Sequence, residues 1–475
     1  MAKGKYLFEP YSIEEGNREI PNLKTWTEYL YHPYKFIKFH WEMLALLKSN
    51  RFVQWEKPRG SAKSTLGQSY ALHYCLENPN KNILYISNTA EQVQAINRES
   101  RGKITTRLEP VYGKLQTDLW SNRGFIISWR KEDVKGYNIF YIGELGPATG
   151  THNDLIIFDD ILDGENTSTA ELRAKTERWI QQTVYPTMNP DCQILWINTR
   201  YHIRDYSGKL EQLGFVKAKG NTAIIYDENG NEESYWKERY SLADIYEQKK
   251  LGSITFKTQY MNDPSDLDDI ILWQDSFWQE ISDNEIENTD YLSDSFTMVI
   301  DPAFSEKQTS DYTALGIFAI PANNTNERHL IYSNRYKIRP SQILKKIIPL
   351  VNKYHIRNII IESVFESQVL PDLIKDQFQS ENTSDDISVY AFKPQGDKIC
   401  RFLKSEGLFE QGLVKFCHNP EMKTECEYFG SGEGHDDYVD MLSCGLIMLN
   451  ILFGFSFNDY VSFTTEKSRS LYEKI

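Results

Sequence analysis

A loop with the composition of a phosphate-binding turn lies near the start of the chain. Residues 57–65 read Lys-Pro-Arg-Gly-Ser-Ala-Lys-Ser-Thr, between an apolar run at 52–55 and a helical pattern. Small residues let backbone N–H groups surround phosphate oxygens at a helix N-terminus. Lys63 would neutralise the β- and γ-phosphates, and Ser64 would bind Mg²⁺. Gly60 is the only glycine in the loop, so the loop alone also fits an ordinary basic turn.

A strand that ends in two carboxylates follows at a separation that suits a Walker B motif. The apolar run 155–158 leads directly into Asp159 and Asp160. Asp159 would hold the Mg²⁺ ion, and Asp160 would orient or deprotonate the attacking water. Such a pair is otherwise a turn or a helix cap. Together with the loop it predicts a P-loop ATPase. A further strand, 194–197, ends in Asn198-Thr199-Arg200, which would lie near the same nucleotide.

Carboxylates with a different spacing occur in the second half of the chain. Asp301 ends one strand-like run, Glu362 ends another, and Asp436, Asp437 and Asp440 open an apolar helix, while Asp311 lies between the strands. Such groups can converge to bind two Mg²⁺ or Mn²⁺ ions about 3.5–4 Å apart, which clamp a phosphodiester. Hard oxygen ligands suit these ions and do not suit zinc. Each carboxylate alone also fits a helix cap or a loop residue. The set predicts a two-metal nuclease.

The elements that must position these groups follow two patterns. In the first half, strands alternate with helices and predict an α/β domain with a central parallel sheet; the strands are 52–55, 83–87, 155–158 and 194–198, and the helices are 64–77, 90–107 and 170–184. In the second half, strands 295–300, 314–320 and 328–336 follow one another. A helix at 342–355 comes next, capped by Ser341 and kinked by Pro349, and then a strand at 358–362. This order predicts a mixed sheet.

We expect five segments along the chain. They are an N-terminal arm (1–38), an ATPase domain (39–263), an acidic linker (264–294), a nuclease domain (295–457) and a polar tail (458–475). The linker is expected because acidic residues crowd this stretch with few basic partners. A solvated face of the first domain is the alternative for this stretch.

Composition excludes several classes of protein. The 475 residues include 53 Lys and Arg against 67 Asp and Glu, a formal net charge of −14, which argues against a broadly basic nucleic-acid binder. Six sparse cysteines suit a reducing compartment, and the Cys and His residues between 417 and 435 match no zinc spacing. No apolar signal segment is visible at the N-terminus. The apolar stretch 442–457 is short for a membrane span and predicts a buried helix.

In this order the motifs resemble the large terminase subunit of tailed bacteriophages, from about residue 39 to residue 449. The resemblance is carried by Phe39-His40 before the 58–65 loop, by 150–160, by Asn198 to His202, by 256–264 and by the carboxylate motifs. It implies an ATP-driven DNA translocase joined to a ribonuclease-H-like nuclease domain with a mixed sheet. Such proteins package concatemeric DNA into a procapsid and cut it.

The resemblance also implies roles for residues. It assigns ATP and its Mg²⁺ to Arg59, Gly60, Ser61, Ala62, Lys63, Ser64, Thr65, Asp159, Asn198 and Thr199. Arg59 would contact phosphate and respond to hydrolysis. The family usually has Glu where Asp160 stands, and Asp163 or Glu165 could substitute for it. The nuclease triad corresponds to Asp301, Glu362 and Asp437, with Asp436 and Asp440 as alternatives for the third ligand.

The implied partners are double-stranded DNA, the portal protein of the procapsid and the small terminase subunit. We expect a homo-oligomeric ring on the procapsid, a monomer in isolation, no membrane, and a location in the cytoplasm of the infected bacterial host. A neighbour's arginine would reach the γ-phosphate, with Arg98, Arg101 and Arg107 as candidates or helix-surface charges. A basic run could track the DNA backbone or be a solvated face; it comprises Lys393, Lys398, Arg401 and Lys404.

Two rival functions fit parts of the pattern. One is a P-loop helicase or translocase whose ribonuclease-H-like domain is not catalytic. The other is a non-enzymatic scaffold that docks on the portal and binds ATP only structurally. The carboxylate set separates the first rival from a terminase, and ATP hydrolysis separates the second.

Overall fold

The computed structural model describes residues 19–148, 150, 152–264, 272–302, 312–338, 342–362, 369–380, 387–393, 397–430 and 435–454. Asp311, the Ser341 cap, the tail 458–475 and residues 1–18 of the expected 1–38 arm lie outside these ranges. The chain forms two compact units. The first contains Met1–Tyr246 and Phe256–Asp268, and the second contains Glu247–Thr255 and Asp269–Ile475.

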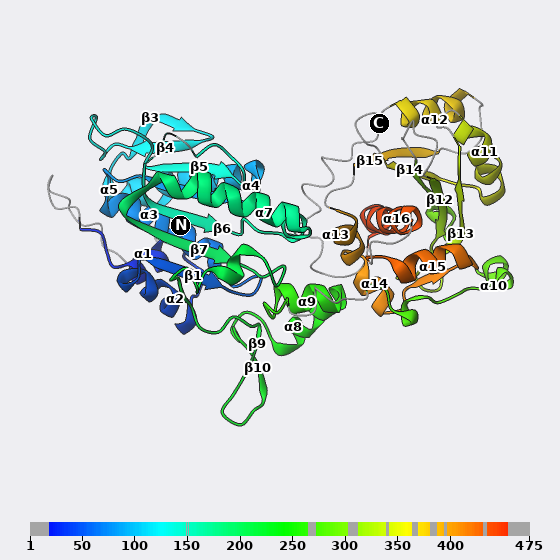
Figure 1. The fold of residues 1–475 in the computed structure, drawn as a ribbon, viewed down its shortest axis with the longest axis horizontal. Coiled ribbons are helices and arrows are strands. Elements are labelled where there is room, and N and C mark those ends of the chain that lie inside the picture. The colour runs from blue at the N-terminus through cyan, green and yellow to red at the C-terminus, as the bar shows by residue number, and fades with distance from the viewer. Residues whose placement is uncertain are drawn as a thin grey trace, which may run out of the picture. The chain divides into compact units, whose positions relative to one another are not determined.

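The first unit is built on an 8-stranded sheet with the order β3-β4-β5-β2-β6-β7-β1-β8 (Figure 1). Its strands are β1 (Phe52–Glu56), β2 (Ile83–Ser87), β3 (Gln116–Ser121), β4 (Gly124–Ile127), β5 (Ile139–Gly143), β6 (Asn153–Asp159), β7 (Met188–Asn198) and β8 (Val216–Lys217). Along the sheet, β5, β2, β6, β7, β1 and β8 pair in parallel with their neighbours. β3 and β4 add an antiparallel edge beside β5. The predicted parallel α/β domain is confirmed.

Helices cover both faces of this sheet. Successive side chains of each strand point to opposite sides, so each face has its own apolar residues to bury. The buried cluster on one face joins alternate strand residues such as Tyr85 and Ile157 to α1 (Leu23–Leu30), α2 (Lys38–Ser49) and α3 (Lys63–Glu77). The cluster on the other face joins Ile86 and Phe158 to Trp179 at the end of α7. Figure 1 shows α7 (Ala170–Trp179) in front of the strands. The strands therefore read as unbroken apolar runs.

Two predicted helices change geometry near their ends. Helix α4 (Ala90–Lys103) is capped by Thr89 and continues into a π-helical turn at Ile104–Leu108. Helix α7 is capped by Thr169 and continues into a π-helical turn at Ile180–Val184. Both cap side chains accept a backbone N–H three residues later, which fixes the helix start. The periodicity of the sequence matches these segments but does not reveal the change of winding.

The remaining elements of the first half are short. They are α5 (Glu109–Tyr112), α6 (Gly164–Thr167), the hairpin of β9 (Ile224–Tyr226) and β10 (Glu232–Ser234), α8 (Leu242–Gln248) and α9 (Ser253–Gln259). The described part of the expected N-terminal arm packs into the first unit. Leu23 and Trp26 of α1 are buried in the core of the first unit, because their spacing places both on one helix face.

The second unit contains a 6-stranded sheet with the order β15-β14-β11-β12-β13-β16. Its strands are β11 (Thr297–Asp301), β12 (Thr313–Ala319), β13 (Arg328–Tyr336), β14 (Asn358–Glu362), β15 (Ser388–Phe392) and β16 (Val414–Phe416). β11, β12 and β13 pair antiparallel, whereas β14, β15 and β16 join in parallel. The predicted mixed sheet is confirmed.

Two helical layers cover this sheet. Ile300 and Ile361 face α11 (Ile343–Tyr354) and α12 (Val369–Ser380). Val299 and Ile360 lie in the other buried cluster, with α16 (Asp437–Phe453). Elements α10 (Asp283–Asn288), α13 (Lys398–Leu403), α14 (Glu406–Glu410) and α15 (Pro420–Tyr428) complete the unit.

Helix α16 approaches its sheet closely, and glycine makes this possible. A Cβ at Gly445 would lie 2.8 Å from Cε2 of Phe318, closer than real Cβ contacts come, and 3.0 Å from Cγ2 of Val299, which is also tight. The predicted buried helix is therefore present. No helix among the described residues is long and apolar enough to cross a membrane.

The expected acidic linker differs from the structure over its described part, 272–294. Leu272, Trp273 and Phe277 are buried in the core of the second unit. The described acidic residues of this stretch, such as Asp275, Asp283 and Glu285, are exposed and dominate its composition, so the sequence conceals the buried apolar residues. Helix α10 follows in the same stretch, with Ser282 as its N-cap.

Candidate functional site

The loop before α3 has the backbone of a phosphate-binding turn. Gly60 has φ +77°, a left-handed conformation that glycine adopts without steric cost. Ala62, the residue before α3, has φ 59°, which costs a residue with a Cβ roughly 1 kcal/mol or more. Such strain is common at ligand sites, where the surrounding structure holds it in place.

Lys63 joins three of the predicted motifs. Its ammonium donates a hydrogen bond to Oγ1 of Thr199 at 2.7 Å and lies 3.2 Å from Oδ1 of Asp160. Lys63 is 5% exposed. The ends of β6 and β7 therefore meet the phosphate loop, as expected from neighbouring parallel strands whose carboxyl ends lie at one edge of the sheet.

Asp159 sits directly beside the loop helix. Its Oδ1 accepts a hydrogen bond from the Ser64 hydroxyl, and its Oδ2 accepts one from the Tyr85 hydroxyl, both at 2.7 Å. Burial, and then the neighbouring charge of Asp160, raise the pKa of Asp159 to about 6. A hydroxyl and a carboxylate in contact are oxygen donors of the kind that Mg²⁺ prefers. The pair fits the predicted Mg²⁺ site. Tyr85, on β2, gave no motif signal.

Asp160 has a left-handed backbone, with φ 46°. Its N–H donates to the carbonyl of Ile197 at 3.0 Å, which ties the turn after β6 to β7. Among its two expected substitutes, Asp163 caps α6 by accepting the N–H of Asn166, and Glu165 is exposed in the first turn of that helix. Asp160 is therefore the carboxylate that the structure places next to Lys63.

Two other residues that we predicted to bind nucleotide have their side chains paired with other parts of the first unit. Arg59 donates from Nη1 to Oε1 of Gln259 at 2.6 Å, and its N–H donates to the Gln259 carbonyl at 2.9 Å. Asn198 is buried and accepts a hydrogen bond from Gln54 at 3.1 Å. Arg59 is thus turned toward α9, and Asn198 is held within the sheet. Arg107, one candidate arginine finger, donates to the carbonyl of His32.

The second site is built on two neighbouring strands. Ile300 and Ile361 pair in the parallel register of β11 and β14, so Asp301 and Glu362 end adjacent strands. Side chains alternate along a strand, so both carboxylates lie on the face that packs against α16. Burial, followed by the charges of Glu362 and Asp440, raises the pKa of Asp301 well above its usual range. Burial and Asp440 raise the pKa of Glu362.

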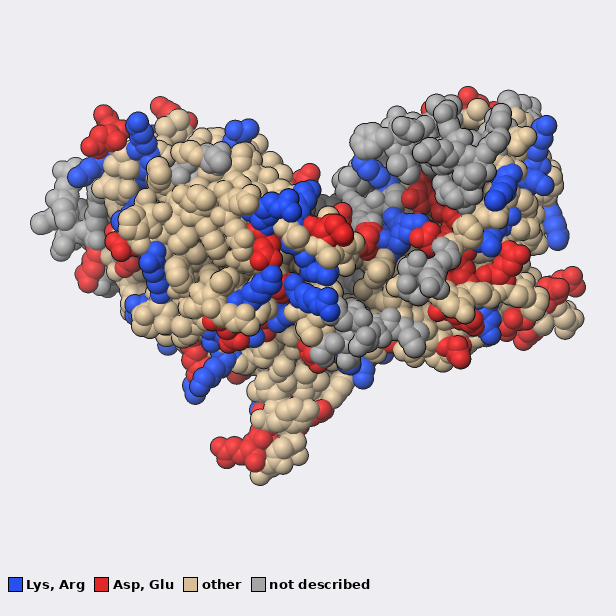
Figure 2. Space-filling view, in the orientation of Figure 1, with Lys and Arg blue, Asp and Glu red and all other residues tan. Residues whose placement is uncertain are grey.

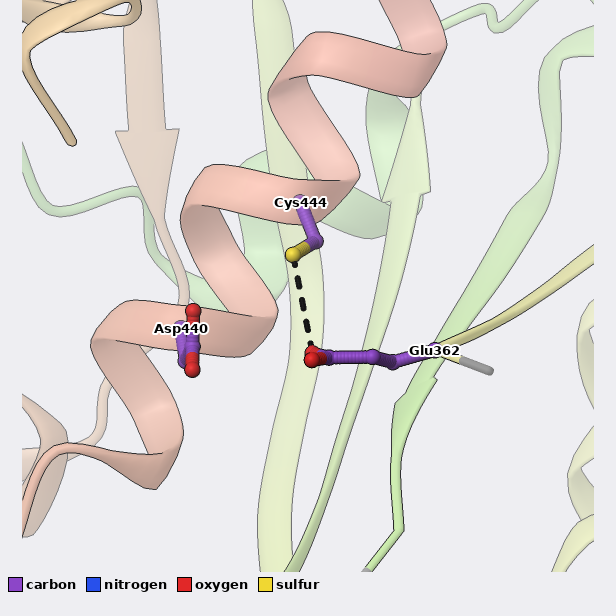
Figure 3. A group of neighbouring side chains, drawn as sticks. All are labelled: Glu362, Asp440 and Cys444. Atoms are coloured by element: carbon purple, nitrogen blue, oxygen red, sulfur yellow. Dashed lines mark hydrogen bonds between the residues drawn. The ribbon is translucent and has the colours of Figure 1, made fainter. Parts of the chain in front are cut away.

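Helix α16 supplies the third side of this cluster. Figure 3 shows Asp440 and Cys444 on successive turns of the helix, with Glu362 reaching toward them from the strand. One ligand atom from each of the three residues lies within 4.8 Å of the others. Asp440 is 5% exposed and Cys444 2% exposed. Cys444 was missed because a lone buried thiol in an apolar helix carries no motif.

The other two aspartates of this motif lie nearer to solvent. The Asp436 side chain is 46% exposed, and the Asp437 side chain is 16% exposed. Burial and the charge of Asp436 raise the pKa of Asp437. Both remain predicted ligands, but of the three alternatives Asp440 is the one that the structure groups with Glu362.

Two residues of the expected basic run face this cluster. Lys398 lies 2.6 Å from Oδ1 of Asp436 and 3.4 Å from Oδ2 of Asp440, and Arg401 pairs with Asp440. Arg401 is 6% exposed. Lys398 and Arg401 therefore lie among the carboxylates of this cluster. Their positions follow from α13 packing beside α16, which the sequence does not reveal.

Glu425 of α15 fixes the start of α16. Its Oε1 accepts the N–H groups of Tyr438 at 2.6 Å and Val439 at 3.2 Å, and its Oε2 pairs with Arg335 at 3.0 Å. These N–H groups belong to the first turn of the helix, which has no internal acceptors. Burial raises the pKa of Glu425 to about 7, although these backbone hydrogen bonds oppose the shift.

Comparisons with known proteins find similarity in sequence and in fold. The family described as Terminase RNaseH-like domain matches residues 298–449, which run from β11 to α16. No curated protein matches the sequence.

Solved structures match over both units. The large terminase of a thermophilic bacteriophage, in complex with ADP, has a TM-score of 0.60 at 9% identity, over 88% of this chain and 99% of that chain. A second crystal form of that phage's terminase gives 0.57 at 10% identity, with the same coverage. At such identity the likeness is one of fold. The chain has the fold of these phage large terminases, and its residues 298–449 match the family of terminase RNaseH-like domains.

Proposed function

We propose that this protein is the large subunit of a DNA-packaging terminase, with an ATPase site in the first unit and a metal-dependent nuclease site in the second. The observation that carries the proposal is the presence of two separate carboxylate centres on one chain. One joins Asp159 to Ser64 of the phosphate loop, and the other joins Glu362 to Asp440.

In the ATPase site, the N–H groups of residues 60–65 surround the phosphates, and Lys63 neutralises charge that develops on the β- and γ-oxygens. Ser64 and Asp159 would hold Mg²⁺, which would supply positive charge to neutralise the phosphates. Asp160 accepts the proton of the attacking water. Thr199 links Lys63 and Asp160 through its hydroxyl, at 2.7 Å and 3.3 Å, and couples the phosphate loop to β7.

Arg59 contacts the γ-phosphate only after it leaves Gln259. Its side chain and its backbone both hydrogen-bond to this residue at the end of α9. Nucleotide binding would therefore exchange an amide partner for a phosphate, a stronger charge-assisted contact. By this exchange, ATP hydrolysis changes the contact between Arg59 and α9 and so affects the rest of the chain.

In the nuclease site, Asp301, Glu362 and Asp440 hold divalent metal ions, with Asp437 and Asp436 at the outer side. Two such ions, when bound, would supply Lewis-acid chemistry for the cleavage of a phosphodiester. Lys398 and Arg401 orient the carboxylates by pairing with Asp440. Lys398 is partly exposed and can also contact a phosphate of the DNA.

The charge distribution favours DNA binding by an assembly. On the face in Figure 2, the described acidic and basic side chains are interspersed, and no broad basic surface is present among them. A chain with a net charge of −14 should bind DNA weakly by itself. We therefore propose a ring of subunits on the portal, which acts with the small subunit on double-stranded DNA in the infected bacterial cell.

The test uses the purified chain together with portal-bearing procapsids. We expect ATP hydrolysis that DNA stimulates, Mn²⁺-dependent cutting of DNA, and ATP-dependent protection of DNA from an added nuclease when procapsids are present. Protection without cutting by the wild-type chain would favour a translocase with a non-catalytic second unit. Binding to procapsids without ATP hydrolysis would favour a scaffold.

A further inference from the structure

A thiol stands among the carboxylates of the nuclease centre. Sγ of Cys444 lies 3.7 Å from Oε2 of Glu362, on the side chain that also approaches Asp440 (Figure 3). Oxygen ligands alone select Mg²⁺ or Mn²⁺, whereas a thiolate selects softer ions such as Zn²⁺ and Cd²⁺. Cys444 thus gives this cluster a chemistry that the carboxylates do not have.

The distances fit a tetrahedral ion. Zn–S and Zn–O bonds of about 2.3 and 2.1 Å at a tetrahedral angle place the sulfur and oxygen about 3.6 Å apart. The observed separation between Sγ of Cys444 and Oε2 of Glu362 is 3.7 Å. All three ligand atoms lie within 4.8 Å of one another, so a shift of about 1 Å would bring Asp440 to the same ion.

The backbone and the surroundings favour a fixed ligand set. Asp440 and Cys444 are four residues apart in α16, so they lie on one helix face. Gly445 lets α16 lie close to Phe318 and Val299 of the sheet, because a Cβ at this position would be crowded by both side chains. Oδ1 of Asp440 is paired with Arg401, while its Oδ2 lies 3.4 Å from Lys398, a residue that is partly exposed and can move.

We propose that Glu362, Asp440 and Cys444 form a binding site for one thiophilic divalent cation, Zn²⁺ or Cd²⁺, which competes with the Mg²⁺ or Mn²⁺ of the nuclease. Binding forms a metal–sulfur bond and releases the thiol proton to solvent. A water molecule completes the tetrahedral coordination. The bound ion removes two carboxylates from the catalytic set and so inhibits cutting. The competition rests on the proposed nuclease function, but the binding does not.

The first measurement is direct binding of Cd²⁺ to the full-length protein without DNA, followed by the ultraviolet thiolate-to-metal charge-transfer band. We expect the band to saturate at a single equivalent in wild-type protein and to be absent in Cys444→Ala. Cys426→Ala is the matched control: it also removes a buried thiol from the second unit but leaves the site intact. It should keep the band.

Cys444→Ser separates ligation from packing, because a hydroxyl can still donate to Glu362 but binds Zn²⁺ poorly. We expect Cys444→Ser and Cys444→Ala to weaken Zn²⁺ binding by about tenfold or more, as measured by competition with a chromogenic chelator. The Zn²⁺ concentration that halves Mn²⁺-dependent cutting should rise by a similar factor, with each variant normalised to its own rate without Zn²⁺.

A thiolate band that persists in Cys444→Ala, or a wild-type protein without the band, would overturn the proposal. So would equal Zn²⁺ affinity in Cys444→Ser and wild type, which would leave Cys444 as a packing residue only. These failures do not touch the nuclease proposal. A protein that binds Cd²⁺ as described but never cuts DNA would instead overturn the nuclease function alone.

Discussion

The Ser64 hydroxyl donates a hydrogen bond to Oδ1 of Asp159 at 2.7 Å, although 95 positions separate the two residues in sequence. This contact joins the first turn of the phosphate-loop helix to the end of the central strand β6. It brings together a hydroxyl and a carboxylate, oxygen groups that would hold the Mg²⁺ of a bound ATP in the proposed function. The two residues that we propose as Mg²⁺ ligands of the ATPase site are therefore in direct contact.

The pKa of Asp159, raised to about 6, predicts how this site responds to acid. Below that pH a proton competes with Mg²⁺, so the Mg²⁺ concentration for half-maximal ATP hydrolysis should rise about tenfold per pH unit. Tyr85→Phe removes the hydrogen bond that favours the ionised form, so the rise should begin at higher pH. Steady-state ATPase titrations with Mg²⁺ between pH 5 and 8 measure this shift.

The neighbouring ring offers a control for that experiment. Tyr141 lies with its ring centroid 5.5 Å from that of Tyr85, and the residue is buried. Tyr141→Phe should leave the Mg²⁺ titration at its wild-type pH dependence. Identical profiles for Tyr85→Phe and wild type would mean that this hydrogen bond does not tune Asp159.

The third proposed nuclease ligand can be identified by comparing Asp440 of α16 with Asp436, the N-cap of this helix. Asp440 is buried beside Glu362, and the Asp436 side chain is 46% exposed. Asp440→Asn should therefore reduce Mn²⁺-dependent cutting by about a hundredfold or more, and Asp436→Asn by only a few fold. Plasmid cleavage is the measurement, with circular dichroism to show that each variant is folded. The reverse order of effects would reject Asp440 as a ligand.

The cap on α16 makes a prediction about stability. Glu425→Ala leaves the N–H groups of Tyr438 and Val439 without their acceptor, at a cost of about 1–3 kcal/mol. Hydrogen exchange at these two amides, followed by mass spectrometry, should accelerate strongly. Glu421→Ala is the control, since this residue lies on the same helix with a 70% exposed side chain, and it should change stability by less than about 0.5 kcal/mol. Equal exchange rates in the two variants would argue against the cap.

Glu406 predicts a pH dependence of folding. Burial, and then the charge of Glu410, raise the pKa of Glu406 from 4.5 to about 8. The folded state therefore keeps a proton that the unfolded chain loses, so this contribution to stability is present below about pH 4.5 and is lost as the pH rises through about 8. Glu406→Gln keeps the neutral shape and removes the dependence.

Thermal melts from pH 5 to 9 check this prediction. The melting temperature of Glu406→Gln should rise relative to wild type as the pH increases, while Glu287→Gln, at an exposed site of the same unit, should run parallel to wild type. Parallel curves for Glu406→Gln and wild type would show that Glu406 is ionised in the folded protein at neutral pH.

Motifs that lie on regular elements could be predicted from the sequence alone. Apolar runs with flanking helices located β2, β13 and β14 at the bounds seen in the structure. Lys63, Asp159 and Thr199 converge because the ends of parallel strands share one edge of the sheet. The register of β11 and β14 likewise brings Asp301 beside Glu362.

Contacts that depend on packing between distant helices could not be predicted. Nothing in the local sequence of Lys398 and Arg401 shows that α13 lies beside α16, so these residues looked like a surface strip. The choice among Asp436, Asp437 and Asp440 depends on the rotation of α16, which Gly445 and the Glu425 cap determine. Trp273 was hidden because acidic neighbours dominate its segment.

The central claim is that one chain carries two independent catalytic centres, and paired assays of two variants test it most directly. DNA-stimulated ATP hydrolysis and Mn²⁺-dependent plasmid cleavage should be measured on wild type, Lys63→Ala and Asp301→Ala. Lys63→Ala should lose ATP hydrolysis by about a hundredfold or more and still cut DNA. Asp301→Ala should lose cutting by a similar factor and still hydrolyse ATP. Cutting by Asp301→Ala, or ATP hydrolysis by Lys63→Ala, at the wild-type rate would contradict the account.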